Sequence, residues 1–92
     1  MTERETVATD LPGWGVEGEH LVGSWRFDDF ASAFAAATRI AFLAERTDHH
    51  PDLRVSWGRL EMRVTTHSAG RLTGKDVDLA RAVEAAIGPP RG

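Results

Sequence analysis

The sequence predicts an α+β fold in two layers: an antiparallel four-stranded sheet with two helices packed on one face, in the order ββαββα. Two stretches of alternating apolar and polar residues are each long enough for a pair of strands, and each is followed by a helical pattern. Packing both helices on one face of the sheet is the natural arrangement for this order. We expect a single domain over residues 13–88, after a poorly ordered N-terminal segment at 1–12.

The first two strands are predicted between Trp14 and Phe27. Gly18 supplies the turn between them, and beyond it Leu21, Gly23 and Trp25 alternate with more polar residues. This alternation is typical of strands that present one face to a core.

A helix of about 18 residues follows, over the segment DDFASAFAAATRIAFLAER. Asp28 or Asp29 is expected to cap its N-terminus, where an acidic side chain also suits the helix dipole. The i, i+4, i+7 spacing predicts that one face of this helix is buried. The residues of that face are Phe30, Phe34, Ala37, Ala41 and Ala44.

The second pair of strands is predicted after Pro51, a residue that turns the preceding position away from helical dihedrals. Leu53, Val55 and Trp57 alternate as one strand, and Gly58 marks a break or bulge. Alternation then resumes as the last strand. Its apolar positions are Leu60, Met62 and Val64.

The last helix is predicted to begin at Thr73 and to end at Gly88. The sequence TGKD has the spacing of a capping box, with Asp76 in the position of the carboxylate. On this reading Asp76 is more a capping residue than a catalytic one.

The composition limits the classes of partner. Net charge is −3, with acidic and basic residues interleaved, whereas nucleic-acid binding needs a clustered positive face, so we expect no nucleic-acid partner. Without cysteine the chain has no disulfide or thiolate metal site. No apolar run approaches the ~20 residues of a membrane span, and the N-terminus lacks signal-peptide features. We therefore expect a cytoplasmic location and no membrane association.

The segment ERTDHHPDLRVSW places His49 and His50 side by side on the connection between a helix and a strand. His67 follows the last predicted strand. Imidazole titrates near pH 6.5 in general, so histidines around one pocket suit a reaction that removes one proton and supplies another. Acid–base catalysis is therefore one hypothesis for these three residues.

Two alternatives remain open from the residues alone. A zinc site is chemically adequate, but neighbours in an extended segment point opposite ways and the spacing fits no helical zinc motif, so we predict no metal. The other alternative is that the histidines are ordinary loop residues. Trp14 and Trp57 are likewise either core aromatics or the walls of a slot for a flat heterocycle.

A longer motif surrounds these histidines. A carboxylate, three residues and His-His-Pro are followed at fixed distances by an aromatic residue, a third histidine and an aspartate. The motif positions are Glu45, His49, His50, Pro51, Trp57, His67 and Asp76. Together with Gly13-Trp14 and the segment FDDFASAF, they resemble the pterin-4a-carbinolamine dehydratase family over roughly residues 13–87.

The resemblance implies an α+β fold that assembles into a homodimer or a dimer of dimers. It implies dehydration of 4a-hydroxytetrahydropterin to quinonoid dihydropterin, with the pterin as substrate and neither a metal nor another cofactor. This reaction recycles the pterin of aromatic amino acid hydroxylases, so a functional link to such a hydroxylase is expected.

The resemblance also implies catalytic roles for His49, His50 and His67. His49 and His67 are the acid and base candidates, whereas His50 mainly holds the pterin. The substrate-binding positions that carry over are Glu45, Asp48, Pro51 and Trp14.

Two departures from the family pattern stand out. Relatives often have two glycines after the last histidine, whereas this chain has Gly70-Arg71, and Arg71 would be strained if that position needed a positive φ. Trp57-Gly58 also replaces the usual Tyr-Asn. Some relatives act without catalysis, as transcriptional coactivators or in assembly of a carbon-fixing enzyme, so an adaptor role is the alternative hypothesis.

Overall fold

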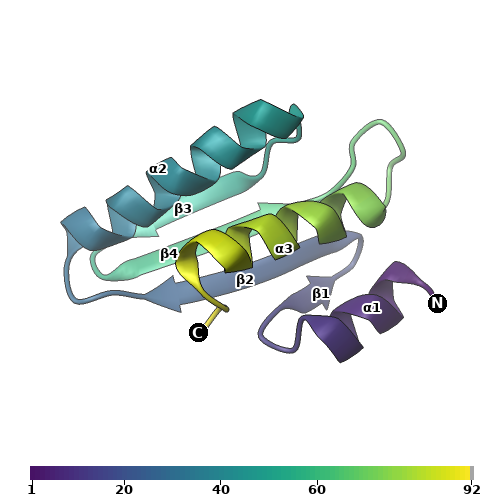
Figure 1. The fold of residues 1–92 in the computed structure, drawn as a ribbon, viewed down its shortest axis with the longest axis horizontal. Coiled ribbons are helices and arrows are strands. Elements are labelled where there is room, and N and C mark those ends of the chain that lie inside the picture. Colours follow the sequence, from purple (N-terminus) through teal and green to yellow (C-terminus); the bar gives the residue numbers. More distant parts are fainter. Residues whose placement is uncertain (92) are drawn as a thin grey trace.

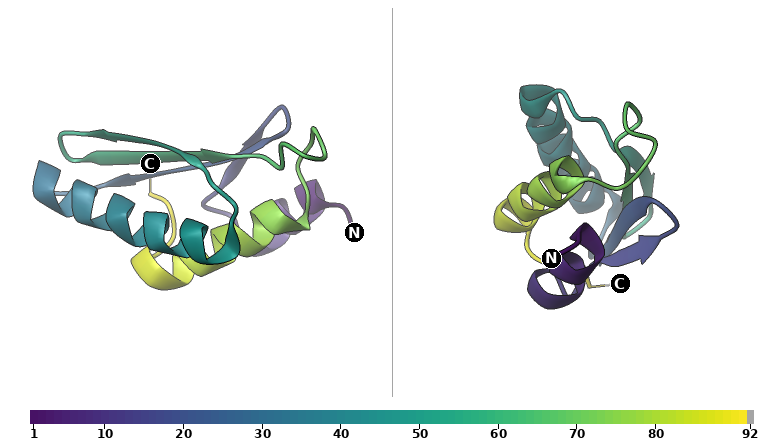
Figure 2. Two further views of the ribbon diagram at one scale, coloured as in Figure 1. Left: turned by 90° about the horizontal axis from the view of Figure 1, so that it is seen from above. Right: turned by 90° about the vertical axis from the view of Figure 1, so that its right-hand side faces the viewer.

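The computed structural model describes residues 1–91, in which an antiparallel sheet forms one layer and helices cover one of its faces (Figures 1 and 2). The strands lie in the order β1-β2-β4-β3. Their bounds are β1 (Gly15–Glu17), β2 (His20–Arg26), β3 (Asp52–Ser56) and β4 (Arg59–Val64). The helices are α1 (Glu3–Asp10), α2 (Phe30–Thr47) and α3 (Gly74–Ile87). The predicted α+β fold and its ββαββα order are confirmed, with α1 as an additional element.

The pairing register explains which face of the sheet is covered. Three residues of β4 are buried: Leu60, Met62 and Val64. Their register partners on the neighbouring strand β2 are Trp25, Gly23 and Leu21, in that order. The charged residues between them point away from the helices because successive side chains alternate between the two faces. The core therefore lies between the sheet and the pair α2 and α3, as Figure 2 shows.

α2 begins at the predicted cap. Asp29 accepts a hydrogen bond from the backbone N–H of Ser32 at 2.7 Å, which holds the pKa of the Asp29 carboxyl below its ordinary value. A carboxylate at a helix N-terminus satisfies an otherwise unpaired donor and complements the helix dipole.

The buried face of α2 differs from the prediction. Ala37 and Ala44 are buried as expected, but Phe30 and Phe34 are 49% and 56% exposed, and Ala41 is also exposed. The face toward the core consists of Ala33, Ala36, Ala37, Ile40 and Ala44. Because most residues of α2 are apolar, spacing alone fits several faces, and the small alanines are those that let the helix lie close to the sheet and α3.

The N-terminal segment also differs from the prediction. A poorly ordered segment was expected at residues 1–12, whereas residues 3–10 form α1. Thr2 and Glu5 make a capping box, and Val7 and Leu11 are both 2% exposed in the core. The sequence signal is weak because so few side chains of this short helix face inward. None of the helices in residues 1–91 has the length and apolar character that crossing a membrane requires.

The turn between β3 and β4 depends on Gly58, which has φ +66°. A Cβ on this residue would lie 2.8 Å from the carbonyl oxygen of Phe27, whose own N–H donates to the Gly58 carbonyl. We expect Gly58→Ala to lower the free energy of unfolding by about 3 kcal/mol, through left-handed strain and backbone overlap together. Urea denaturation measures this loss.

Gly18→Ala is the matched control. Gly18 has φ +61° in the other hairpin turn, but a Cβ there would meet nothing within 4 Å. This variant is expected to lose only about 1 kcal/mol, the cost of the left-handed conformation. Equal losses in the two variants would contradict the role given to the Phe27 contact.

Candidate active site

The three histidines of the motif meet at one end of the sheet. Because β3 and β4 are antiparallel, Asp52 at the start of β3 pairs with Arg63 near the end of β4. The connection that enters β3 therefore lies beside the loop that leaves β4, and α3 begins directly after that loop (Figure 1). The connection that enters β3 carries His49 and His50, and the loop that leaves β4 carries His67.

Asp48 directs the connection as α2 ends. It has φ 51° and ψ 43°, and it is the one non-glycine residue with positive φ within residues 1–91. The N–H of His49 donates to the Ala44 carbonyl at 3.1 Å, which completes a left-handed helix end. Aspartate tolerates this conformation better than most residues do, so the chain can turn sharply and bring both histidines to the sheet end.

Asp76 in the first turn of α3 is fully buried. Its Oδ2 accepts hydrogen bonds from the backbone N–H of Thr73 at 2.9 Å and from the Thr66 hydroxyl at 2.8 Å. Its Oδ1 lies 2.6 Å from Nε2 of His49, an imidazole that is only 14% exposed. The predicted capping box is confirmed, and its carboxylate also holds a motif histidine, which its capping role alone did not indicate.

These contacts assign the protons around Asp76. A carboxylate only accepts hydrogen bonds, so Nε2 of His49 carries a proton and Nδ1 is left for another partner. The Thr66 hydroxyl donates to Asp76, so in its 2.6 Å contact with the Thr73 hydroxyl it is the acceptor. The arrangement is an aspartate–histidine pair in which the aspartate fixes the tautomer and orientation of the imidazole.

His50 is held at the surface by carboxylates of the α2 end. Its Nε2 lies 2.5 Å from Glu45 Oε2, and its Nδ1 lies 3.9 Å from Asp48 Oδ1. The imidazole is 54% exposed and the two carboxylates more so. Glu45 and Asp48 thus lie against His50, and the substrate-binding role that the resemblance implies for them stays a prediction.

His67 is exposed, and its imidazole makes no hydrogen bond within residues 1–91. It lies in a turn closed by the N–H of Gly70, which donates to the carbonyls of Thr66 and His67. Gly70 takes the positive φ of this turn, at 66°, so the strain considered for Arg71 does not arise.

The three histidines line one hollow of about 350 Å³. Its remaining lining residues are Asp48, Thr65, Thr66, Ser68 and Lys75. The sequence analysis named neither the hydroxyl residues of this lining nor its one lysine, Lys75. The signal for Lys75 was its place in the first turn of the helix that follows the His67 loop, since a helix start there must lie beside that loop.

Other predicted site residues lie elsewhere. Trp14 is 6% exposed in the core, where its indole N–H donates to Glu84 at 2.9 Å and its ring packs edge-on against Trp25. Pro51 is half-buried beside the hollow without lining it, and Trp57 is exposed in the turn at the opposite end of β3. The pocket role implied for Trp14 is therefore not seen in this arrangement.

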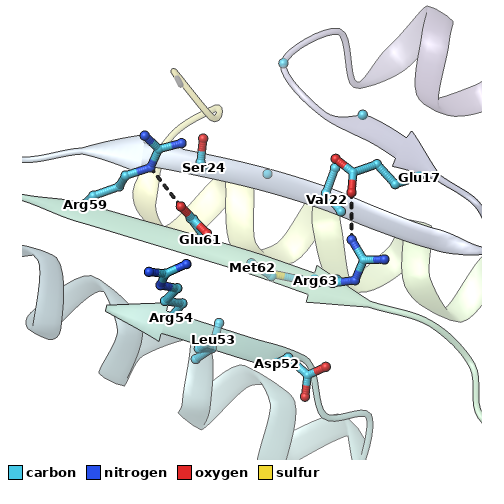
Figure 3. Close-up of a pocket in the computed structure, with 13 residues that line it drawn as sticks. Glu17, Val22, Ser24, Asp52, Leu53, Arg54, Arg59, Glu61, Met62 and Arg63 are labelled. Atoms are coloured by element: carbon cyan, nitrogen blue, oxygen red, sulfur yellow. Dashed lines mark hydrogen bonds and ion pairs between the residues drawn. The ribbon is translucent and has the colours of Figure 1, made fainter. Parts of the chain in front are cut away.

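Within residues 1–91, no three His, Cys, Asp or Glu side chains gather as a set of metal ligands. A larger hollow, of about 530 Å³, lies on the uncovered face of the sheet (Figure 3). Its charges largely pair with one another: Arg63 donates to Glu17 at 2.8 Å, and Arg59 Nε lies 3.0 Å from Glu61 in an ion pair without hydrogen-bond geometry. The histidine hollow is therefore the candidate active site.

The sequence profile described as pterin 4 alpha carbinolamine dehydratase matches residues 1–86. The chain belongs to this family. A family member from Synechococcus sp. strain WH7803, which carries the dehydratase name provisionally, is 45% identical over 85 residues, covering 92% of this chain and 91% of the relative. A member from Nocardia farcinica, named in the same way, is 40% identical over 79 residues, covering 86% and 83%.

Two solved structures are similar to this one. A crystal structure from Brucella melitensis, titled as a transcriptional coactivator/pterin dehydratase, has a TM-score of 0.86 at 32% identity and covers 96% of this chain and 98% of its own. A pterin dehydratase-like protein, described as a RuBisCO assembly factor of the alpha-carboxysome, has a TM-score of 0.66 at 19% identity, covering 83% and 88%. The second likeness concerns the fold alone.

The pairing of Asp76 with His49 has a spectroscopic consequence. In Asp76→Asn the side-chain oxygen can still accept from Thr66 and Thr73, which turns the amide NH₂ toward His49. Nε2 must then become an acceptor, so we expect the neutral imidazole to change from the Nε2–H to the Nδ1–H tautomer. Long-range ¹H–¹⁵N spectra of the imidazole report the tautomer directly.

The same substitution is expected to cost about 1–3 kcal/mol of unfolding free energy, since charge-assisted hydrogen bonds to a buried group are lost. Asp78→Asn, on an exposed position of the same helix, is the control and leaves both the tautomer and the stability unchanged. An unchanged His49 tautomer in Asp76→Asn would contradict the assignment.

Proposed function

We propose that this family member catalyses dehydration of 4a-hydroxytetrahydropterin to quinonoid dihydropterin and water, by acid–base catalysis of its histidines. The observation that carries the proposal is the aspartate–histidine pair Asp76–His49, which lines the same hollow as His67. A fixed imidazole and an unbonded one in a single hollow supply two proton-transfer groups, which this reaction needs. Membership of the dehydratase family supports the substrate class.

The reaction balances without an external reagent. The C4a–O bond breaks and its oxygen leaves as water after taking a proton, while N5 loses its proton and its electron pair forms the C4a=N5 double bond. One histidine therefore donates a proton and another accepts one. We assign these roles to the pair His49 and His67, and we assign His50, braced by Glu45, to holding the pterin.

Lys75 extends this assignment, because it adds a positive charge to a hollow that otherwise contains carboxylate and imidazole groups. In the proposed reaction its ammonium group is suited to binding a carbonyl oxygen of the pterin ring. By the same proposal the product returns to the tetrahydropterin cycle of an aromatic amino acid hydroxylase.

A non-catalytic adaptor role is the second candidate, and the exposed aromatic face of α2 favours it. Phe30 and Phe34 lie 6.0 Å apart between ring centroids, and both are about half exposed. In the adaptor role this face, with Ala41, would receive a protein partner. We also propose that the same face joins copies of the chain into a homodimer or a dimer of dimers. The Brucella structure, whose title names both a coactivator and a dehydratase, supports treating the two roles as compatible.

The catalytic proposal is tested by stopped-flow absorbance with 4a-hydroxytetrahydropterin generated in situ. We expect acceleration by the wild-type protein that survives a chelator, and a fall in kcat of about 10²- to 10⁴-fold in His49→Ala and His67→Ala. His50→Ala is expected to raise KM more than it lowers kcat, because its proposed role is binding.

His20→Ala is the control for this series, since His20 begins β2 and is not part of the hollow. Its kinetics should match those of the wild type. If folded wild-type protein does not accelerate the reaction, the catalytic proposal is refuted, and the non-catalytic adaptor role becomes the candidate function.

The self-association proposal is tested by light scattering coupled to gel filtration. Phe34→Glu places a charge on the aromatic face, so we expect it to shift the protein from an oligomer to a monomer. Trp57→Glu changes an aromatic residue that is 74% exposed at a distant turn, and it should leave the assembly intact. A monomeric wild type, or equal behaviour of the two variants, would refute the proposed interface.

A further inference from the structure

The turn that carries His67 is held together by its own backbone. The N–H groups of Ala69 and Gly70 donate to the Thr66 carbonyl at 3.1 and 3.0 Å, and the Thr66 N–H donates to the Arg71 carbonyl at 3.4 Å. The turn is therefore a small closed unit. Its position over the hollow depends on how the two ends of the turn are attached to the rest of the molecule. We call these ends the incoming stem, at Thr66, and the outgoing stem, at Leu72.

The two stems are attached differently. On the incoming side, the Thr66 hydroxyl is bonded to the buried carboxylate of Asp76. On the outgoing side, Leu72 is 3% exposed in the core, and its backbone N–H donates to Oε1 of Glu19 at 3.1 Å. The outgoing stem thus donates a hydrogen bond to a residue that is 53 positions away in the sequence.

Glu19 is itself held in place. It lies in the two-residue turn between β1 and β2, where Gly18 has the positive φ expected of the first central position of a tight hairpin turn. Arg4 of α1 donates at 2.7 Å both to Oε2 of Glu19 and to the Gly18 carbonyl. One side chain therefore links α1, the first hairpin and the stem of the His67 turn.

We propose that Glu19 is a positioning residue for the candidate active site: it places His67 over the hollow through the backbone N–H of Leu72, with Arg4 holding the carboxylate. This proposal rests on the proposed function in its catalytic part. Glu19 touches neither the hollow nor its histidines, so its effect on the reaction passes through the loop.

The charge state of Glu19 fits this role. The Leu72 N–H, and then Arg4, hold the pKa of the Glu19 carboxyl below its ordinary value against the opposing effect of desolvation. A lowered folded-state pKa means that this contact contributes fully above the unfolded-state pKa, and that its contribution is lost only as the pH falls through the folded value. The clamp formed by Glu19, Arg4 and the Leu72 N–H is therefore intact at neutral pH.

The ion pair of Glu19 and Arg4 alone would not predict an effect on catalysis. Both side chains are about half exposed, and such surface pairs add little to stability. The exposed pair of Glu17 and Arg63, at 2.8 Å, makes no hydrogen bond or ion pair with residues 66–72, which makes Glu17 a matched control.

The experiment compares Glu19→Ala, Glu19→Gln and Glu17→Ala by steady-state kinetics and by amide hydrogen exchange. We expect Glu19→Ala to lower kcat about tenfold with KM within about twofold, because a displaced general acid or base slows chemistry more than binding. Glu19→Gln retains an oxygen for the Leu72 N–H and should stay within about threefold of the wild type. Glu17→Ala should equal the wild type.

Hydrogen exchange tests the positioning independently of activity. In Glu19→Ala, residues 66–72 should exchange faster, while β2, β4 and α2 keep their wild-type protection. Unchanged exchange in the loop overturns the proposal, and so does faster exchange with a wild-type kcat. If the wild-type protein proves inactive, the proposed function fails. The positioning role of Glu19 is then decided by hydrogen exchange alone: faster exchange of residues 66–72 in Glu19→Ala supports it, and unchanged exchange overturns it.

Discussion

The buried carboxylate of Asp76 is the constraint on which the rest of the site depends. A carboxylate without exposure is costly unless donors surround it, and here the donors come from three different segments, of which the one with His49 is 27 positions away. Thr73 belongs to the helix start, Thr66 to the loop after β4, and His49 to the connection after α2. The carboxylate that caps the start of α3 therefore also orients the His49 imidazole.

The antiparallel register of β3 and β4 explains why a chain of this size can build such a corner. The two strands join through a tight turn at Gly58, so their outer ends meet at the far end of the sheet. Two short segments meet at that end. The connection from α2 to β3 turns through Asp48 in its left-handed backbone conformation, and the loop from β4 leads to α3. Little chain entropy is lost in bringing them together, because each is fixed at both ends by an element of the core.

Local patterns in the sequence predicted what depends on local structure. Alternation located the strands. The aspartate cap and Pro51 located the ends of α2, and the capping box and Gly88 located those of α3, because caps and turns act within a few residues. The motif located His49, His50 and His67. Spacing failed on Phe30 and Phe34, since a helix in which most residues are apolar offers several possible buried faces and tertiary packing selects one of them.

Other features that local patterns could not settle rest on contacts between distant parts of the chain. Trp14 packs in the core because its indole N–H reaches Glu84 on α3, and Asp76 contacts His49 across 27 positions. No local pattern encodes such pairs. α1 was missed for a related reason, since its value to the fold lies in two buried side chains, Val7 and Leu11, rather than in its own weak amphipathic pattern.

The arrangement of α2 separates the two surfaces that the proposals use. Phe34 lies about 20 Å along the helix axis before the C-terminal end of α2, at 1.5 Å per residue, whereas His49 and His50 follow directly after that end. A copy or partner that covers Phe30 and Phe34 therefore need not cover the histidine hollow. Glu45 is exposed in the last turns of the same helix, where it braces His50. An interface that extends along α2 as far as Glu45 would reach the hollow through this contact, whereas one confined to the first half of the helix would leave the site open to a small molecule.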